Sequence, residues 1–160
     1  MSDFAKSWTL SRQRLIDTIS DLSTPQLNWS LHPQALTIAQ MAVHVAGVEI
    51  FFGSQLTGQA KNDLETRISR ASTEGVVNEN PFPFTDQEMS ADFVLQALEI
   101  SKGFVKHIIE NPTPEILNKE IVSALGPIIT GDGGFTRLAF HAAYHQGQAY
   151  QIRTAPGFPS

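Results

Sequence analysis

The chain has 160 residues, of which 41% are hydrophobic and 17% charged, with a formal net charge of −5 and no cysteine. This length and balance predict one globular domain over residues 1–160 and argue against a disordered chain. The lack of cysteine excludes disulfides, thiolate metal ligands and a cysteine nucleophile, so any reacting thiol must arrive with a cosubstrate.

The first predicted element is an amphipathic helix over residues 3–22. Its apolar residues recur at helical spacing on one face: Phe4, Trp8, Leu15, Ile19 and Leu22. A stripe of this kind is typical of a helix that covers a core. Residues 23–36 are expected to form a connector, because Pro33 disfavours helix at that point.

A second helix is predicted from a capping box at Thr37 and Gln40 to residue 56, where Thr57 and Gly58 provide a stop signal. This helix is strongly apolar, and His44 falls on its core-facing side. Residues 58–84 are polar and long for a loop, so a short helix is expected near residues 63–71. The segment could cross between bundle helices or form part of a lid over a cleft.

The third long helix is expected to begin at Asp86, after a capping box that starts at Thr85, or at Ser90, which could be the cap instead, and to end at Glu110 before two prolines. A short turn is expected at residues 114–117. The glycine-rich residues 131–134 lack the context of a phosphate-binding loop and are interpreted as an irregular turn. The last helix is predicted over residues 135–154.

Four long helices and no convincing strand pair predict an all-α protein with a four-helix bundle fold. No internal repeat is present in the sequence. The side chains that bear chemistry must therefore be carried mainly by the helices.

Two histidines on the last predicted helix, His141 and His145, are four residues apart. This spacing places both imidazoles on one face, one turn apart, where they can bind one metal ion. Metalloprotease helices use the same spacing, but this sequence lacks the Glu that those enzymes place after the first His. His44 also points into the bundle and could supply a third ligand. The alternative is that the three histidines only pack in the core.

The residues around these histidines resemble a known family. The run from His44 to Glu49 is similar to the second-helix motif of the DinB/YfiT-like bundle proteins. The run from His141 to Gln148, followed by Arg153, resembles their fourth-helix signature, with Gln146 at a position where Arg is common. The resemblance covers nearly the whole chain in order of elements and length.

This resemblance implies a four-helix bundle in which His44, His141 and His145 hold one divalent metal ion, often within a homodimer. Some relatives use low-molecular-weight thiols such as bacillithiol or mycothiol, and others are described only as metal-dependent hydrolases. The family's link with DNA damage concerns induction and implies no contact with DNA.

Three neutral imidazoles leave the ion's charge uncompensated and at least one coordination position open, which is typical of a catalytic site. Imidazole ligands suit zinc, nickel or copper, and we expect zinc or nickel. Glu49 and Gln148 are weak candidates for catalytic or supporting roles, although Glu49 fits a helix-surface carboxylate slightly better. His32 and His107 are not included in the site.

The sequence therefore favours a metalloenzyme that transfers a small thiol to an electrophilic small molecule. A metal-dependent hydrolase that uses bound water, and a non-catalytic protein that binds a metal or small ligand, are the alternatives. The scattered basic residues predict no nucleic-acid binding. No signal peptide or membrane-spanning run is recognised, so a cytoplasmic location is expected.

Overall fold

The computed structural model describes residues 2–160. This part of the chain forms seven helices and two short strands. In chain order the elements are α1 (Asp3–Ile19), α2 (Thr24–Leu27), α3 (Ile38–Thr57), α4 (Asp63–Arg70), α5 (Ala91–Glu110), α6 (Pro114–Asn118), β1 (Glu120–Val122), β2 (Ile128–Thr130) and α7 (Gly131–Arg153). The predicted all-α class is confirmed.

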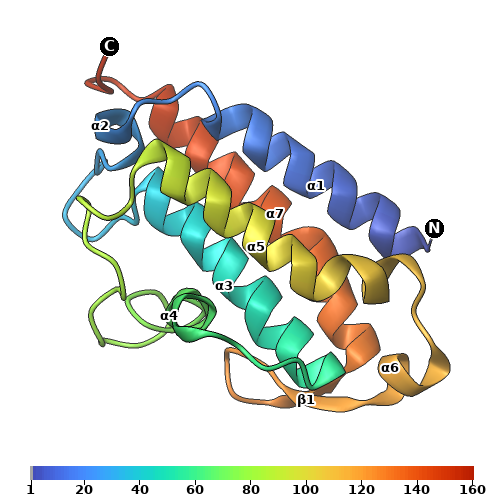
Figure 1. The fold of residues 1–160 in the computed structure, drawn as a ribbon. Helices are drawn as coiled ribbons and strands as arrows, with labels where there is room; N and C mark the ends of the chain where they lie inside the picture. The colour runs from blue at the N-terminus through green and yellow to red at the C-terminus, as the bar shows by residue number, and fades with distance from the viewer. Residues whose placement is uncertain (1) are drawn as a thin grey trace.

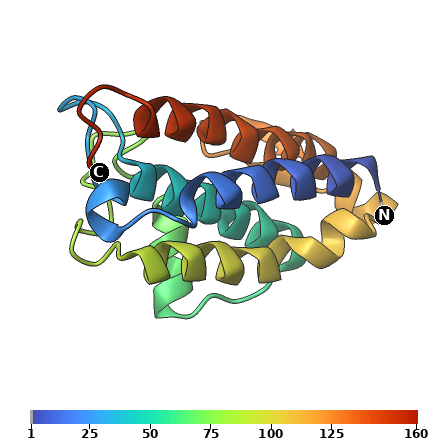
Figure 2. The same ribbon diagram turned by 90° about the horizontal axis from the view of Figure 1, so that it is seen from above.

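The four long helices lie alongside one another in both views of the molecule (Figures 1 and 2). Helix α1 packs against α7, α3 packs against α5, and α3 also contacts α7. The colours in Figure 1 show that α1 and α7 run in one direction and α3 and α5 in the other. No helix within residues 2–160 combines the length and apolarity that crossing a membrane requires.

Side-chain caps fix where the long helices begin. Thr37 and Gln40 form the predicted capping box at the start of α3. Ser90, rather than Asp86, precedes the first turn of α5, and its hydroxyl accepts a hydrogen bond from the Phe93 amide. These caps satisfy amides that have no partner within the helix itself.

Because α3 and α5 run in the same direction, the chain between them must return along the bundle. Residues 58–90, called the crossing segment below, make this return and contain α4 close to its predicted position. Helix α4 packs against α3. Of the two possibilities left open for residues 58–84, the structure thus shows the crossing between bundle helices.

Two expectations for the segment before α7 are wrong. Residues 120–130 form an antiparallel pair of strands, which is too short to show an alternating pattern in the sequence. Helix α7 begins at Gly131, so the glycine-rich run forms its first turn, capped by Thr130. Gly131 packs so closely on α6 that a Cβ atom there would lie 1.9 Å from the Ile116 carbonyl oxygen.

The core lies between the four long helices and is built from their apolar stripes. Its largest fully buried side chains include Leu15, Ile50, Phe52, Leu98, Phe104 and Phe135. Arg153 near the end of α7 forms an ion pair with Asp21, which ties α7 to the end of α1. This packing fixes α3 and α7 relative to each other and so positions the residues that they share.

Candidate metal centre

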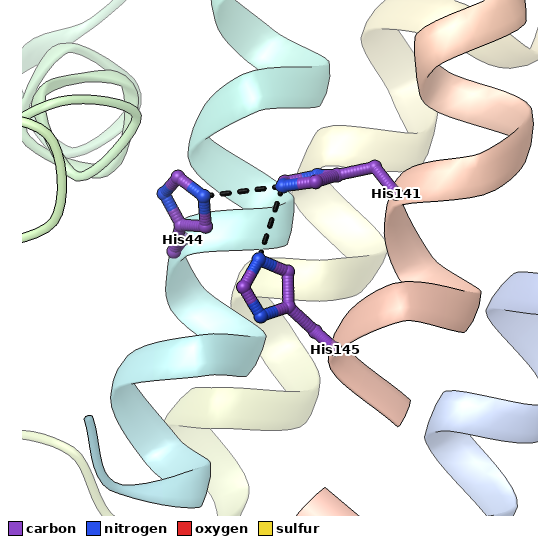
Figure 3. A group of neighbouring side chains, drawn as sticks. All are labelled: His44, His141 and His145. Carbon is purple, nitrogen blue, oxygen red and sulfur yellow. Dashed lines mark hydrogen bonds between the residues drawn. The ribbon is translucent and has the colours of Figure 1, made fainter. Parts of the chain in front are cut away.

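Three histidines from α3 and α7 meet inside the bundle. His44 lies on α3, and His141 and His145 lie one turn apart on α7. Figure 3 shows the three rings turned toward one another from these two helices. The predicted grouping is thus present in the structure, although His44 and His141 are 97 positions apart. We call these three residues the histidine cluster.

The Nε2 atoms of the histidine cluster converge. His141 Nε2 lies 3.1 Å from His44 Nε2 and 3.1 Å from His145 Nε2. One ligand nitrogen of each ring lies within 4.8 Å of the others. Two nitrogens bound to a tetrahedral zinc ion at about 2.0–2.1 Å would be about 3.3 Å apart. The spacing therefore suits three ligands of one small cation.

Two of the outer ring nitrogens are held by oxygen acceptors. His44 Nδ1 lies 2.8 Å from the Ala71 carbonyl oxygen, which can only accept, so this nitrogen donates. His145 Nδ1 lies 2.8 Å from Gln148 Oε1 and donates to it in the same way. When these two rings are neutral, a proton on Nδ1 leaves each with an unprotonated Nε2 that faces the cluster.

His141, the middle ring, cannot satisfy both neighbours by hydrogen bonding. A proton on its Nε2 could be donated to only one of the two facing nitrogens, so the other contact would join two lone pairs. Its Nδ1 is buried and has no hydrogen-bond partner within residues 2–160. A divalent cation would accept all three Nε2 lone pairs at once, so the donor set fits a metal ion that imidazole prefers.

The surroundings of the cluster favour neutral rings. Burial lowers the pKa of His141 to about 2, with a further contribution from the charges that His44 and His145 can carry. Burial also lowers the pKa of His145 to about 4, and that of His44 below its ordinary value. Neutral imidazole is the form that binds metal. The rings are therefore ready to act as ligands at neutral pH.

A glycine on α3 lets the crossing segment reach His44. A Cβ atom at Gly47 would lie 2.6 Å from the Ile68 carbonyl oxygen and 2.8 Å from the Ser72 amide nitrogen. No side chain fits there, so the end of α4 can pack directly on α3. This close approach brings the Ala71 carbonyl to the His44 ring.

The histidine cluster forms part of the wall of an open pocket of about 760 Å³. The other walls come from residues 32–36, the crossing segment, the turn between β1 and β2, and further residues of α3 and α7. The lining is mainly apolar, and it contains no Asp or Glu from residues 2–160. The volume lies in the range typical of small-molecule sites.

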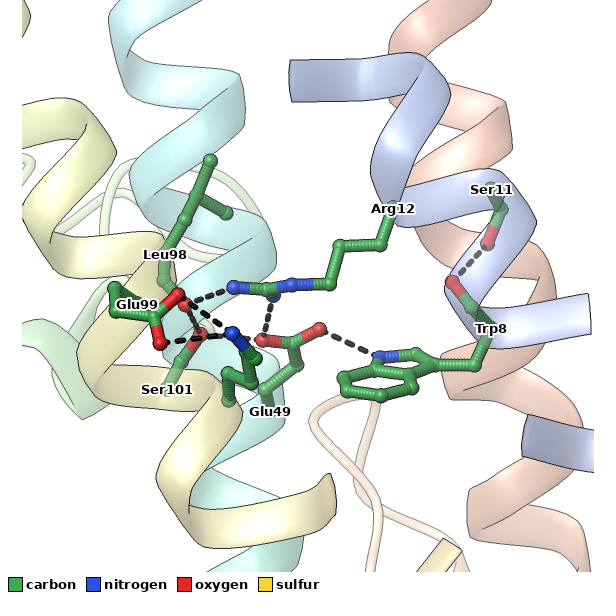
Figure 4. A network of polar contacts seen from close by, with 8 residues as sticks. Trp8, Ser11, Arg12, Glu49, Leu98, Glu99 and Ser101 are labelled. Atoms are coloured by element: carbon green, nitrogen blue, oxygen red, sulfur yellow. Dashed lines mark hydrogen bonds and ion pairs between the residues drawn. The ribbon is translucent and has the colours of Figure 1, made fainter. Parts of the chain in front are cut away.

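Glu49 lies outside this pocket, and its interpretation as a helix-surface carboxylate is wrong. Its side chain is only 2% exposed, because α1 and α5 cover it. Figure 4 shows it between Trp8, Arg12 and Ser101. Arg12 Nη1 donates to one carboxylate oxygen over 2.6 Å, Trp8 Nε1 donates to the other over 2.8 Å, and Ser101 also donates. The carboxylate is thus fully engaged away from the histidines.

The two glutamines of α7 have different partners. Gln148 holds His145 and lines the pocket, so it lies where a role in orienting a ligand was expected. Gln146 donates instead to Thr18 Oγ1 on α1. The position at which the resembling family often has Arg therefore faces another helix in this chain.

The two remaining histidines are not part of the cluster. His107 is exposed near the end of α5. His32 lines the pocket but is not grouped with the three converging nitrogens. Leaving both out of the predicted metal ligands agrees with their positions.

Two features of the site were missed by sequence reasoning. The Ala71 carbonyl is a backbone group, and no sequence signal points to it. Arg137 lines the pocket one turn before His141. Its spacing of four residues from His141 is the same signal that linked His141 to His145, so this residue could have been found.

Comparison with known proteins gives one family and a common fold. The sequence matches the model of the DinB superfamily over residues 7–149. A conserved protein from Enterococcus faecalis superposes with a TM-score of 0.66 at 17% identity, covering 94% of this chain and 93% of the other. A DinB-like protein from Bacillus cereus has the same score and identity, with 98% and 94% covered. No curated protein matches the sequence.

Proposed function

The chain belongs to the DinB superfamily, and from this premise we propose that it is a metal-dependent protein that acts on small molecules through an open three-histidine site. The ligands would be Nε2 of His44, His141 and His145. Zinc or nickel would suit three imidazoles better than calcium or magnesium. The leading activity is the transfer of a small thiol to an electrophile.

One observation carries this proposal. His141 Nε2 lies 3.1 Å from the Nε2 atoms of both His44 and His145, while those two rings are held from behind by the Ala71 carbonyl and Gln148. Outer hydrogen bonds of this kind fix the tautomer and orientation of metal-binding histidines. Gln148 is thus proposed as a positioning residue.

The number of ligands favours a reactive site over a structural one. Structural zinc sites are normally closed by four protein ligands, whereas catalytic sites keep a position open. Within residues 2–160, no Cys, Asp or Glu joins the three-histidine group. An ion held there would face the pocket, where a small molecule can reach it.

Thiol transfer fits the residues that line the pocket. When bound, the ion would supply Lewis acidity that favours the deprotonated, nucleophilic form of a cosubstrate thiol. The sulfur would form a bond to an electrophilic carbon, the thiol proton would pass to solvent, and the leaving group would depart with its bonding electrons. The apolar walls would hold the electrophile and exclude water.

The lack of a carboxylate in the pocket favours this activity over hydrolysis. A hydrolase commonly needs a general base to accept a proton near the attacking water. No Asp or Glu of the described chain lines the pocket, and the nearby candidate Glu49 is bound to Arg12. The ion would acidify a bound water as well as a bound thiol, but a thiol is the stronger acid to begin with and so depends less on such a base.

The first test is the metal content of untagged protein, measured by elemental analysis. We expect about one zinc or nickel ion per chain in the parent and background levels in His44→Ala and His141→Ala. His107→Ala, which removes an exposed histidine elsewhere, is the matched control and should keep its metal. Background metal in the parent after reconstitution would overturn the proposal.

The second test is catalysis. Metal-loaded protein should conjugate members of a panel of small thiols to a generic electrophile faster than metal-free protein does. Turnover of esters or amides without any thiol would point to hydrolysis instead. Tight ligand retention without turnover in either assay would indicate a binding protein.

The assembly and location of the protein stay predictions. The homodimer implied by the family resemblance can be tested by light scattering of the metal-loaded chain. The expected cytoplasmic location and lack of nucleic-acid binding can be tested by fractionation and by titration with DNA.

A further inference from the structure

The pocket beside the histidine cluster contains one charged side chain. Among residues 2–160, only Arg137 lines it with a formal charge when the histidines are neutral. Arg137 is half-buried on α7, four residues before His141, so both side chains lie on the same face of the helix. Arg137 therefore lies one helical turn from His141 and lines the same pocket.

Arg137 has no partner in the part of the chain that the structure describes. Four other arginines each form an ion pair with a carboxylate: Arg12, Arg67, Arg70 and Arg153. For Arg137 no hydrogen bond or ion pair is made within residues 2–160. A guanidinium has five donors in a planar fork that matches a carboxylate, so an unpaired one at a pocket wall is suited to an anionic ligand.

The net charge of the side chains that line the pocket is positive, like that of Arg137. No acidic residue of the described chain lines it, so nothing there balances Arg137. A divalent ion held by three neutral imidazoles would add two further positive charges. The pocket should therefore attract anions and disfavour cations.

Most of the remaining lining is apolar, and some of these apolar side chains are exposed to solvent. Leu125 is 71% exposed, Phe140 59% and Tyr144 51%, and all three line the pocket. Large apolar side chains that remain exposed around a pocket usually mark a binding site. They would cover the apolar body of a ligand.

We infer that the pocket takes a small molecule with an apolar body and one carboxylate, which pairs with Arg137 while the reacting atom faces the histidine cluster. The inference rests on the proposed function in treating this pocket as the substrate pocket, and it adds the substrate class. Arg137 is then the residue that selects acids over neutral molecules of the same shape.

The test compares acids with their amides by calorimetric titration. Octanoate is compared with octanamide, and phenylbutyrate with phenylbutanamide, on both zinc-loaded and zinc-free protein. The variants are Arg137→Gln, which removes the charge, and Arg137→Lys, which keeps it. Arg14→Gln is the matched control, because Arg14 is an exposed arginine of α1 that does not line the pocket.

We expect the parent to bind at least one acid about tenfold or more tightly than its amide, as charge-assisted pairing predicts. Arg137→Gln should lose this preference while its amide affinity stays unchanged, and Arg137→Lys should keep most of it. Arg14→Gln should behave as the parent. These results would establish Arg137 as the selecting residue.

Three results would overturn the inference. They are no preference for the acids in the parent, no binding of either acid, or a preference that survives Arg137→Gln. If the preference for acids is lost when zinc is removed but is kept in Arg137→Gln, the carboxylate binds the ion instead of Arg137. Metal content is measured separately. If acid binding depends on Arg137 but the protein holds no metal, the inference about Arg137 stands and only the proposed function fails.

Discussion

Two buried polar clusters share helix α3 but are completed in opposite ways. Glu49 is enclosed by Arg12, Trp8 and Ser101, which come from α1 and α5. His44, five residues earlier on the same helix, meets the two histidines of α7 with nitrogens facing nitrogens. The first cluster is satisfied by the chain itself, whereas a bound cation would satisfy the facing nitrogens of the second.

This difference separates residues that hold the helices together from residues that bind. Buried polar groups in folded proteins are almost always paired, and an exception calls for an explanation such as an ion or a functional role. The unpartnered His141 Nδ1 and the facing Nε2 atoms are such an exception. Changes in the Glu49 cluster should therefore affect stability, and changes in the histidine cluster should affect metal binding.

The largest expected effect is on stability, from Glu49→Gln. This change leaves Arg12 buried without a counter-charge, since both side chains of the pair are 5% exposed or less. Loss of one partner of a buried ion pair typically lowers the free energy of unfolding by about 3–5 kcal/mol. Urea denaturation measures the loss, and metal content per folded chain should stay at the parent level.

The double variant Arg12→Met with Glu49→Leu is the control for this prediction. Replacing both charges by apolar side chains removes the unpaired charge, so much of the lost stability should return. A loss below about 1 kcal/mol in Glu49→Gln would contradict the assignment of this cluster to stability.

Metal removal should have the next largest effect. A ligand that binds only the folded chain stabilises it by about 2.7 kcal/mol when its free concentration is about a hundred times its Kd. Chelation should therefore lower the unfolding midpoint of the parent, as measured by thermal denaturation. His44→Ala should show no such shift, and an equal shift in this variant would place the metal elsewhere.

A somewhat smaller effect is expected from pH in the metal-free protein. Because burial lowers the pKa of His141 to about 2 from an ordinary value of 6.5, the unfolded chain binds more protons than the folded chain between these values. Stability should therefore fall as the pH drops below about 6.5, by about 2 kcal/mol for this residue between pH 7 and pH 5.

Urea denaturation at several pH values, with a chelator present, measures this slope. His141→Leu should be less sensitive to acid than the parent, because it lacks the ring that resists protonation. His107→Gln, which removes an exposed histidine, is the matched control and should keep the parent slope. Equal slopes in the parent and His141→Leu would show that burial of this ring has no such cost.

Much of the fold follows from local sequence signals. The apolar stripes and caps such as the Thr37 box predict the four long helices, because both depend on residues within one or two turns. The spacing of His141 and His145 is local in the same sense. The meeting of His44 with this pair depends on how α3 packs on α7, and there the family resemblance supplied what the spacing could not.

The features that sequence reasoning missed depend on contacts between distant segments. Glu49 was assigned to the surface because its partner Arg12 is 37 positions away. The start of α7 at Gly131 depends on close packing against Ile116, whereas glycine by itself favours a turn. Strands of three residues are too short for alternation to predict them.

The smallest predicted effect concerns Gln148, which supports the histidine cluster without binding the ion itself. Its Oε1 accepts from His145 Nδ1 over 2.8 Å and so holds the ring with Nε2 toward the other histidines. Loss of such an outer partner typically weakens metal binding about 10–100-fold, and we expect Gln148→Leu to lie near tenfold. Competition with a chelating dye measures the affinity, and about one ion per chain should still bind at saturation.

Gln146→Leu is the matched control, because Gln146 lies on the same helix but donates to Thr18 on α1. It should keep the parent's metal affinity even if it costs some stability. Comparing Gln148→Leu with Gln146→Leu tests the difference between binding and stability directly. The first change is expected to lower metal affinity, and the second is expected to affect stability alone. Equal metal affinities in Gln148→Leu and Gln146→Leu would mean that His145 is held by packing alone and that its hydrogen bond to Gln148 does not tune the site.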